Sequence, residues 1–230
     1  MSDWQMRPGT VVDTSTDHTH RPFRVEIQVS DPIVHMYQDM HLDGLLAWCV
    51  YLAARGAEAP LSPTTREWVP DMRLPLATWT RPGRPLHPRA AAADGGVWGW
   101  CASRGHYTSV VHTAVQTRRM PTVEAHARYS TSSKFNIGLG PTKARNTASE
   151  ACWPGTIAWS ALGDPDAARI LLGTHLTHLG RMVRHGNGSV LSVQVIEGGP
   201  RDDWTDRIFP GEYPAQVRAP YWHPSRLAVA

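Results

Sequence analysis

The segment Phe-Arg-Val-Glu-Ile-Gln-Val at residues 23–29 alternates apolar and polar side chains. Alternation of this kind predicts a strand with one buried face. Apolar residues at helical spacing follow over residues 41–55, with Asp39 or Asp43 near the start and Gly56 just past the end. Acidic or capping residues at the first turn and glycine after the last turn are typical helix boundaries. These segments predict a strand followed by a helix.

The C-terminal half repeats this order. Residues 155–162 are predicted to form a strand, and Asp164-Pro165 then reads as an N-cap with proline at the first helical position. The apolar spacing predicts that this second helix continues to Val183, before the turn signal Gly-Asn-Gly at residues 186–188. A closing strand is expected over residues 190–196.

The segment between the two halves is expected to be rich in strands. A strand is predicted at residues 73–79, and a hairpin of residues 97–101 and 106–117 is predicted around the turn at 103–105. The complete order predicts an α+β fold with a ferredoxin-like (RRM-like) β-α-β-β-α-β core, an inserted β-hairpin and a glycine-rich loop.

The chain is long enough for one domain with insertions, and we expect a single domain over residues 1–230. Its core spans about residues 23–196, with a basic hairpin insertion at about 80–130. The tail, residues 197–230, has no strong pattern. Its acids are expected to form a solvated charge run beside two arginines: Asp202, Asp203 and Asp206, with Arg201 and Arg207.

The glycine-rich loop reads Lys-Phe-Asn-Ile-Gly-Leu-Gly-Pro-Thr-Lys-Ala-Arg at residues 134–145. Gly138 and Gly140 allow a sharp turn in which successive N–H groups converge on an anion. Thr142 adds a hydroxyl donor, and Lys143 and Arg145 add positive charge. The loop fits neither the Walker pattern nor the dinucleotide fingerprint. It is either a phosphate-binding loop or a glycine-bearing surface turn.

Positive charge is concentrated in the middle of the chain. The net charge is +3, but the window 73–145 holds eleven Lys or Arg and only two acids. Arginine outnumbers lysine twenty-one to two, and arginine can both fork onto a phosphate and stack on a base. The distribution indicates a polyanion partner, or else a solvated basic face without a ligand.

Several classes of function lack their signals. Three widely spaced cysteines without a C-x-x-C pair favour a reduced cytosol over a disulfide framework. No signal peptide and no apolar window of about 20 residues is present, so no membrane segment is expected. His18 and His20 have no third ligand nearby, and neither H-E-x-x-H nor Gly-x-Ser-x-Gly occurs. We therefore expect no metal, no cofactor and no hydrolase site.

Two segments resemble a known family. His-Leu-Asp-Gly-Leu-Leu-Ala-Trp at residues 41–48 and Asn-Ile-Gly-Leu-Gly-Pro-Thr-Lys at residues 136–143 resemble the RAMP superfamily of CRISPR proteins. The similarity is to the Cas five-type subunit of type IV effector complexes. It continues through His-Leu-Gly-Arg at 178–181 and the Gly-Asn-Gly turn, and it covers about residues 23–196.

The resemblance implies a non-catalytic subunit that binds CRISPR RNA (crRNA) in the cytoplasm of a prokaryote. It would hold the five-prime handle of that RNA, use a thumb-like hairpin, and cap a filament of backbone subunits beside the large subunit. Target DNA is a further candidate partner. Together with the basic window, the resemblance assigns RNA contacts to ten residues: Arg118, Arg119, Arg128, Lys134, Asn136, Gly138, Gly140, Thr142, Lys143 and Arg145.

Two alternatives remain. Some RAMP relatives cut precursor RNA without metal by using a histidine, for which His35, His41 and His106 are the candidates here. A general single-stranded RNA-binding protein would share the basic window. The aromatic signature of ordinary RRM domains is absent. Bases would instead stack on arginine or on one of three aromatic residues: Tyr129, Phe135 or Trp100.

Overall fold

The computed structural model describes residues 20–34, 40–55, 73–81, 83–86, 96–120, 122, 124, 127–128, 138, 143–221 and 226–230. Over these ranges the chain is an α+β protein with mostly antiparallel sheets, which confirms the fold class at that level. Its largest sheet has the strand order β10-β1-β9-β6, and every neighbouring pair is antiparallel. The four strands are β1 (Arg21–Val29), β6 (His106–Tyr107), β9 (Thr156–Gly163) and β10 (Val190–Glu197).

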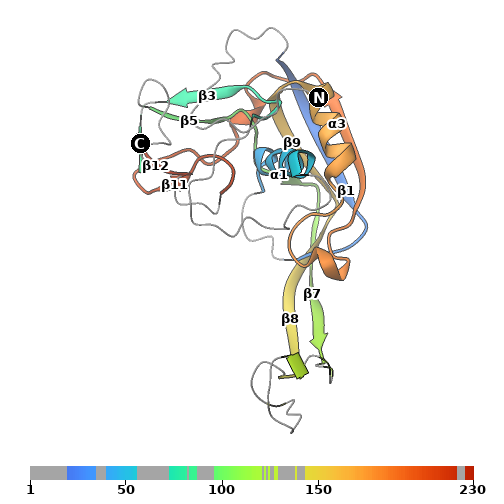
Figure 1. Ribbon diagram of the computed structural model, residues 1–230. Coiled ribbons are helices and arrows are strands. Elements are labelled where there is room, and N and C mark those ends of the chain that lie inside the picture. Colours follow the sequence, from blue (N-terminus) through green and yellow to red (C-terminus); the bar gives the residue numbers. More distant parts are fainter. Residues whose placement is uncertain are drawn as a thin grey trace.

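The helices α1 (Leu42–Arg55) and α3 (Pro165–His175) pack against each other and against this sheet (Figure 1). The main hydrophobic core lies between them. It contains the alternating side chains of β1 together with apolar residues from both helices and from β9: Phe23, Val25, Ile27, Leu46, Cys49, Trp159, Ala168 and Leu172. The predicted strands at residues 23–29, 155–162 and 190–196 and the predicted helix at 41–55 are confirmed.

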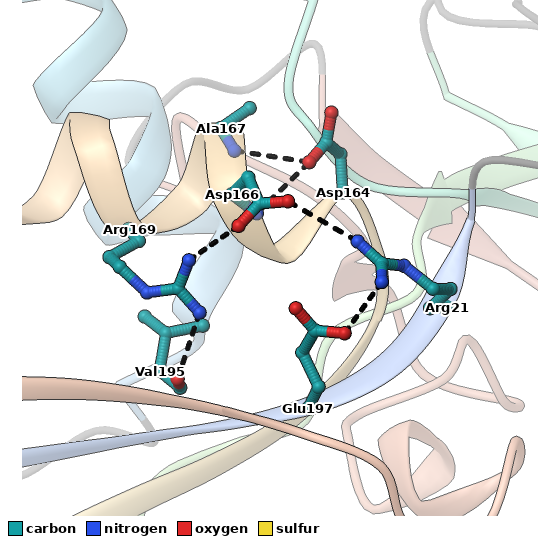
Figure 2. Close-up of polar contacts among 7 residues, drawn as sticks. All are labelled: Arg21, Asp164, Asp166, Ala167, Arg169, Val195 and Glu197. Atoms are coloured by element: carbon teal, nitrogen blue, oxygen red, sulfur yellow. Dashed lines mark hydrogen bonds and ion pairs between the residues drawn. The ribbon is translucent and has the colours of Figure 1, made fainter.

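The second helix begins where the sequence predicts. Asp164 Oδ1 accepts hydrogen bonds from the backbone N–H groups of Asp166 at 3.0 Å and Ala167 at 3.1 Å (Figure 2). Pro165 occupies the first position, where the helix has no use for an N–H group. The first N–H groups of a helix have no acceptor within the helix, and Asp164 supplies an acceptor for two of them.

Ion pairs connect this first turn to the sheet (Figure 2). The guanidinium group of Arg21 on β1 lies 3.3 Å from Asp166 and 2.6 Å from Glu197 on β10. Arg169 pairs with Asp166 and donates to the backbone carbonyl of Val195 at 3.2 Å. The side chains are about half exposed, so each pair contributes little to stability. Their main effect is to orient α3 relative to β1 and β10.

Replacing Asp164 with alanine is expected to lower the free energy of unfolding by about 1 kcal/mol, because two backbone N–H groups lose their acceptor. Asp202→Ala is the matched control. Asp202 precedes the short 3-10 helix η4 (Asp203–Thr205) but makes no capping hydrogen bond. Urea unfolding followed by circular dichroism measures both variants. Equal losses would contradict the capping role of Asp164.

Three smaller sheets complete the described structure, with the strand orders β2-β8-β7, β11-β12-β4 and β3-β5. Their strands, and the remaining 3-10 helix, have these bounds: β2 (Ile33–Val34), β3 (Thr78–Arg81), β4 (Arg84–Pro85), β5 (Val97–Trp100), β7 (Val110–Arg119), β8 (Arg145–Pro154), η3 (Val183–His185), β11 (Ala215–Gln216) and β12 (Leu227–Val229). The strand expected at residues 73–79 instead begins at Thr78, and Leu76 forms only an isolated bridge with Gly163.

The hairpin predicted from residues 97–101 and 106–117 is wrong. Strand β5 pairs with β3, whereas β6 lies at the edge of the largest sheet beside β9. The long strand β7 pairs with β8, for which the sequence predicted no strand. Both strands are exposed over much of their length. Alternation of apolar and polar residues, which predicts a strand with one buried face, is therefore weak in both segments.

The second helix ends at His175 rather than at Val183. Its apolar spacing continues through Leu176 and Leu179, which are buried. However, the backbone there pairs in extended form. The N–H of Leu179 binds the carbonyl of Gly188, and the N–H of Val190 binds the carbonyl of Thr177. These hydrogen bonds between two segments of the same chain replace the bonds that a continuing helix would make.

The C-terminal tail is part of the packed structure. Val217, Ala219 and Ala228 are buried, and Arg207 is only 7 % exposed, so its expected place in a solvated charge run is wrong. Its guanidinium group donates to the carbonyls of Trp100 and Ala102 and, at 2.7 Å, to that of Val217. The sequence did not reveal this because arginine is rarely buried unless it is paired.

Arg207 also reaches the first turn of α1. It donates at 3.1 Å to the hydroxyl of Tyr221, which donates in turn to the carboxylate of Asp43 at 2.7 Å. Asp43 is fully buried and also accepts from the backbone N–H of Ala219. Burial and the nearby Asp43 raise the pKa of Tyr221 well above its ordinary value. This network fixes the start of α1 against the C-terminal segment.

The three cysteines are buried thiols without a disulfide. Burial raises the pKa of Cys49 and of Cys101 to about 12, from an ordinary value of 9.0. Because the raised pKa belongs to the folded state, the associated stability is present below pH 9 and is lost as the pH rises through about 12.

Iodoacetamide should therefore alkylate Cys49 and Cys101 very slowly in the folded protein at pH 8. The thiolate is the nucleophile, and a rise of three pKa units lowers its fraction roughly a thousandfold. Mass spectrometry of the peptides, with and without urea, measures the rates. Equal alkylation in both conditions would contradict this assignment.

Candidate nucleic-acid interface

A long two-stranded ribbon projects from the rest of the described structure (Figure 1). Its strands β7 and β8 pair residue by residue from Val110 opposite Pro154 to Arg119 opposite Arg145. Among the described strands, a neighbour of the ribbon is found at its base, where β2 pairs with β8 at Ala151 and Cys152. The far part of the ribbon is thus held mainly by its own ladder of hydrogen bonds.

The far end of this ribbon carries exposed arginines. Arg118 and Arg119 end β7, Arg145 begins β8, and all three are exposed. Arg119 and Arg145 lie directly opposite each other. Like charges in this position repel and destabilise a strand pair. An anion bound between them would remove that repulsion.

These arginines differ from four others in the body of the protein. There, Arg21, Arg24, Arg104 and Arg169 each pair with a carboxylate. Within the described residues, no ion pair involves the three arginines at the ribbon's end. Their charge is therefore not neutralised by a carboxylate of the described chain, and they are well placed to bind a polyanion.

The ten predicted contact residues fall into two groups. Arg118, Arg119, Lys143 and Arg145 come together at one end of the ribbon, and each is exposed, as are Arg128 and Gly138. The other four lie outside the described residues: Lys134, Asn136, Gly140 and Thr142. The structure thus brings part of the predicted cluster together and leaves the geometry of the glycine-rich loop untested.

The largest sheet does not offer the stacking surface of ordinary RRM domains. On β1 the residues that alternate away from the core are Arg24, Glu26 and Gln28, and on β9 they include Ala158 and Ser160. None is aromatic. Trp100, one of the predicted stacking residues, is only 5 % exposed, so that prediction is wrong. Tyr129 and Phe135 lie outside the described residues.

The sequence reasoning missed a second basic group, beside the base of the ribbon. Arg181, Arg184 and His185 are exposed. The N–H of Arg181 binds the carbonyl of Val34 on β2, and Val34 pairs with Ala151 on β8. The available signal was a cluster of basic residues between Gly180 and Gly186 that follows no helical face. The structure shows that this cluster borders the same small sheet as the ribbon.

The two described histidine candidates have different surroundings. His41 is buried and stacks on Tyr221 with ring centroids 4.9 Å apart. His106 is exposed, and its Nε2 lies 2.9 Å from Asp206, which also pairs with Arg104. His35 lies outside the described residues. The two described histidines thus have different structural roles: His41 is part of the packed interior, and His106 is paired at the surface.

These features define a class: an α+β protein with a projecting ribbon that ends in exposed arginines, which have no ion pair among the described residues. The C-terminal part of the chain is similar to a known family, because the model of CRISPR type IV associated protein Csf3 matches residues 123–230. The match starts before β8 and includes β9, α3, β10 and the C-terminal segment. The matched segment is 108 of the 230 residues, and it supports a relation to type IV CRISPR-associated proteins.

No curated protein matches the chain. None of the helices in the described ranges is long and apolar enough to cross a membrane.

Proposed function

We propose that this chain is the non-catalytic crRNA-binding subunit of a type IV CRISPR ribonucleoprotein, of Cas five type within the RAMP superfamily. It holds the five-prime handle of the RNA and caps the filament of backbone subunits beside the large subunit. It acts in the cytoplasm of a prokaryote, and target DNA is a further partner of the assembled complex.

The observation that carries the proposal is the arginine pair at the end of the ribbon, Arg119 opposite Arg145. Arg145 belongs to the segment that the type IV family model matches. Exposed arginines with no carboxylate partner in the described chain suit a phosphodiester backbone, because each guanidinium group can fork onto a phosphate. In this proposal β7 and β8 are the thumb, and Arg118, Lys143 and the glycine-rich loop extend its contacts.

The proposal includes a ferredoxin-like core. The order β10-β1-β9-β6, with all pairs antiparallel and a helix after each of β1 and β9, supports it. Since the open face of that sheet lacks aromatic residues on its central strands, RNA contacts would come from the ribbon and from the neighbouring Arg181 and Arg184. Handle recognition would then rest on phosphates, 2′-hydroxyls and a few unstacked bases.

The test is to express the chain with the genes that neighbour its own, purify the complex, and sequence the RNA that co-purifies. Short RNAs that share one five-prime end, crosslinked to the ribbon, are the expected result. Heterogeneous RNA would instead favour a general single-stranded RNA-binding protein. Absence of RNA from an intact complex would contradict the proposal.

The same preparation tests the alternative of a metal-independent ribonuclease. Incubation of a labelled precursor RNA with the purified chain in EDTA should leave the RNA intact. His106→Ala is the informative variant, because His106 is exposed and held by Asp206 in the manner of a general base. Cleavage by the wild type that is lost in His106→Ala would overturn the non-catalytic assignment.

A further inference from the structure

We propose that Trp153 on β8 stacks against an unpaired base of the bound RNA; this inference rests on the proposed function. Trp153 is 40 % exposed. Four other described tryptophans, Trp79, Trp98, Trp100 and Trp159, are 0 to 6 % exposed. Tryptophan is usually highly buried, and an indole left in water at the side of a cationic ribbon indicates a binding partner.

The indole lies on the same face of the ribbon as the arginine pair. Trp153 is opposite Val111, which is 62 % exposed, so this part of the face is open. Side chains two residues apart share a face, and Arg145 is eight residues from Trp153 along β8. Its partner Arg119 lies on that face too. At about 3.4 Å per residue, the indole and the arginine pair are about 27 Å apart.

A further cation lies on the neighbouring strand segment near the base of the ribbon. Arg181 bridges to Val34, and Val34 pairs with Ala151, two residues before Trp153. Directly paired residues in antiparallel strands point to the same face. Arg181 is exposed. Along the axis of the ribbon, Arg181 is thus level with Ala151, between the indole and the arginine pair.

The chemistry of this face fits a nucleic acid better than a protein partner. Between the indole and the arginine pair it carries no charged side chain: its residues are Thr113, Val115, Thr117, Thr147, Ser149 and Ala151, of which Ser149 and Ala151 are buried. Glu150, the acid of these two strands, belongs to the opposite face. Aromatic side chains within a positive groove are the usual platform for single-stranded nucleic acid. The exposed Val111 widens the apolar surface that an unstacked base would cover.

The experiment measures the affinity of the full chain for a labelled single-stranded RNA of about 12 nucleotides by fluorescence anisotropy at several salt concentrations. Trp153→Ala should weaken binding about tenfold, since base stacking contributes that much or more. Because stacking is not electrostatic, the salt dependence should remain unchanged. Trp153→Phe should bind within about twofold of wild type, as a phenyl ring still stacks.

Two controls separate stacking from other roles. An abasic oligonucleotide of equal length has the same charge but nothing to stack, so Trp153→Ala should bind it as the wild type does. Trp153→Leu keeps apolar contact with Val111 but lacks a ring, and it should bind as weakly as Trp153→Ala. Thermal unfolding shows that each variant is folded.

Three results would overturn the inference: wild-type affinity in Trp153→Ala, equal losses on the abasic strand, or wild-type affinity in Trp153→Leu. The last would indicate that an apolar contact with the RNA, and not ring stacking, accounts for the role of Trp153. If Arg119→Ala weakens RNA binding while Trp153→Ala does not, only the stacking inference fails. If the wild-type chain binds no RNA, alone or in its complex, the proposed function fails.

Discussion

Replacing both Arg119 and Arg145 with alanine is expected to lower RNA affinity and to reduce its salt dependence. If each arginine neutralises one phosphate of a single strand, the slope of log K against log salt falls by about 1.4 in magnitude, and the affinity at about 0.1 M salt drops roughly 25-fold. Fluorescence anisotropy over a salt series measures both quantities. An unchanged slope would contradict phosphate binding at the end of the ribbon.

The double variant has two matched controls. Arg201→Ala removes an exposed arginine of the C-terminal segment and should leave the slope unchanged. Arg119→Lys with Arg145→Lys keeps both charges and should retain the slope, although it loses the forked contacts. The alanine variant should also unfold at the same temperature as the wild type or a higher one, since it removes a repulsive cross-strand pair. The loss of binding would then not result from unfolding.

The buried network at the start of α1 predicts the largest effect on stability. Arg207→Met should lower the free energy of unfolding by about 3 to 5 kcal/mol, because it leaves buried acceptors unpaired and the Asp43 carboxylate without its nearby cation. Tyr221 transmits this contact, as its hydroxyl accepts from Arg207 and donates to Asp43. Urea unfolding measures the loss. A decrease of the unfolding free energy below about 1 kcal/mol would contradict a stabilising role of Arg207 in this network.

A double-mutant cycle tests whether these groups act together. Asp43→Asn with Arg207→Met removes both charges, so its loss should be smaller than the sum of the two single losses. Additive losses would contradict the network. Tyr221→Phe supplies a separate control, because it keeps the ring that stacks on His41 but removes the hydroxyl.

The raised pKa of Tyr221 predicts how stability changes with pH. The folded state favours the protonated phenol, so its contribution to stability is complete below the ordinary value of 10.0 and declines as the pH rises above it. Tyr221→Phe should therefore have a shallower decline in unfolding free energy above that pH. An equal decline in both proteins would assign the alkaline loss to other groups, such as Cys49 and Cys101.

The sequence by itself determined the elements whose signals are local. The alternation at residues 23–29 places one side of β1 in the core, because successive side chains of a strand point to opposite faces. Asp164-Pro165 marks the start of α3, because a cap needs only neighbouring backbone groups. The concentration of arginine before residue 146 predicts a polyanion site without any knowledge of the fold, and this stays a prediction.

The tertiary structure decided which segments meet. The strand β7 pairs with β8 rather than with β5, which places Arg119 opposite Arg145 across a long intervening segment. It also buries Trp100 and leaves Trp153 exposed, although both indoles lie in apolar stretches of the sequence. Arg207 is buried because distant carbonyls and Tyr221 surround it. Such outcomes depend on contacts between residues far apart in the chain, and a local pattern of side chains does not predict those contacts.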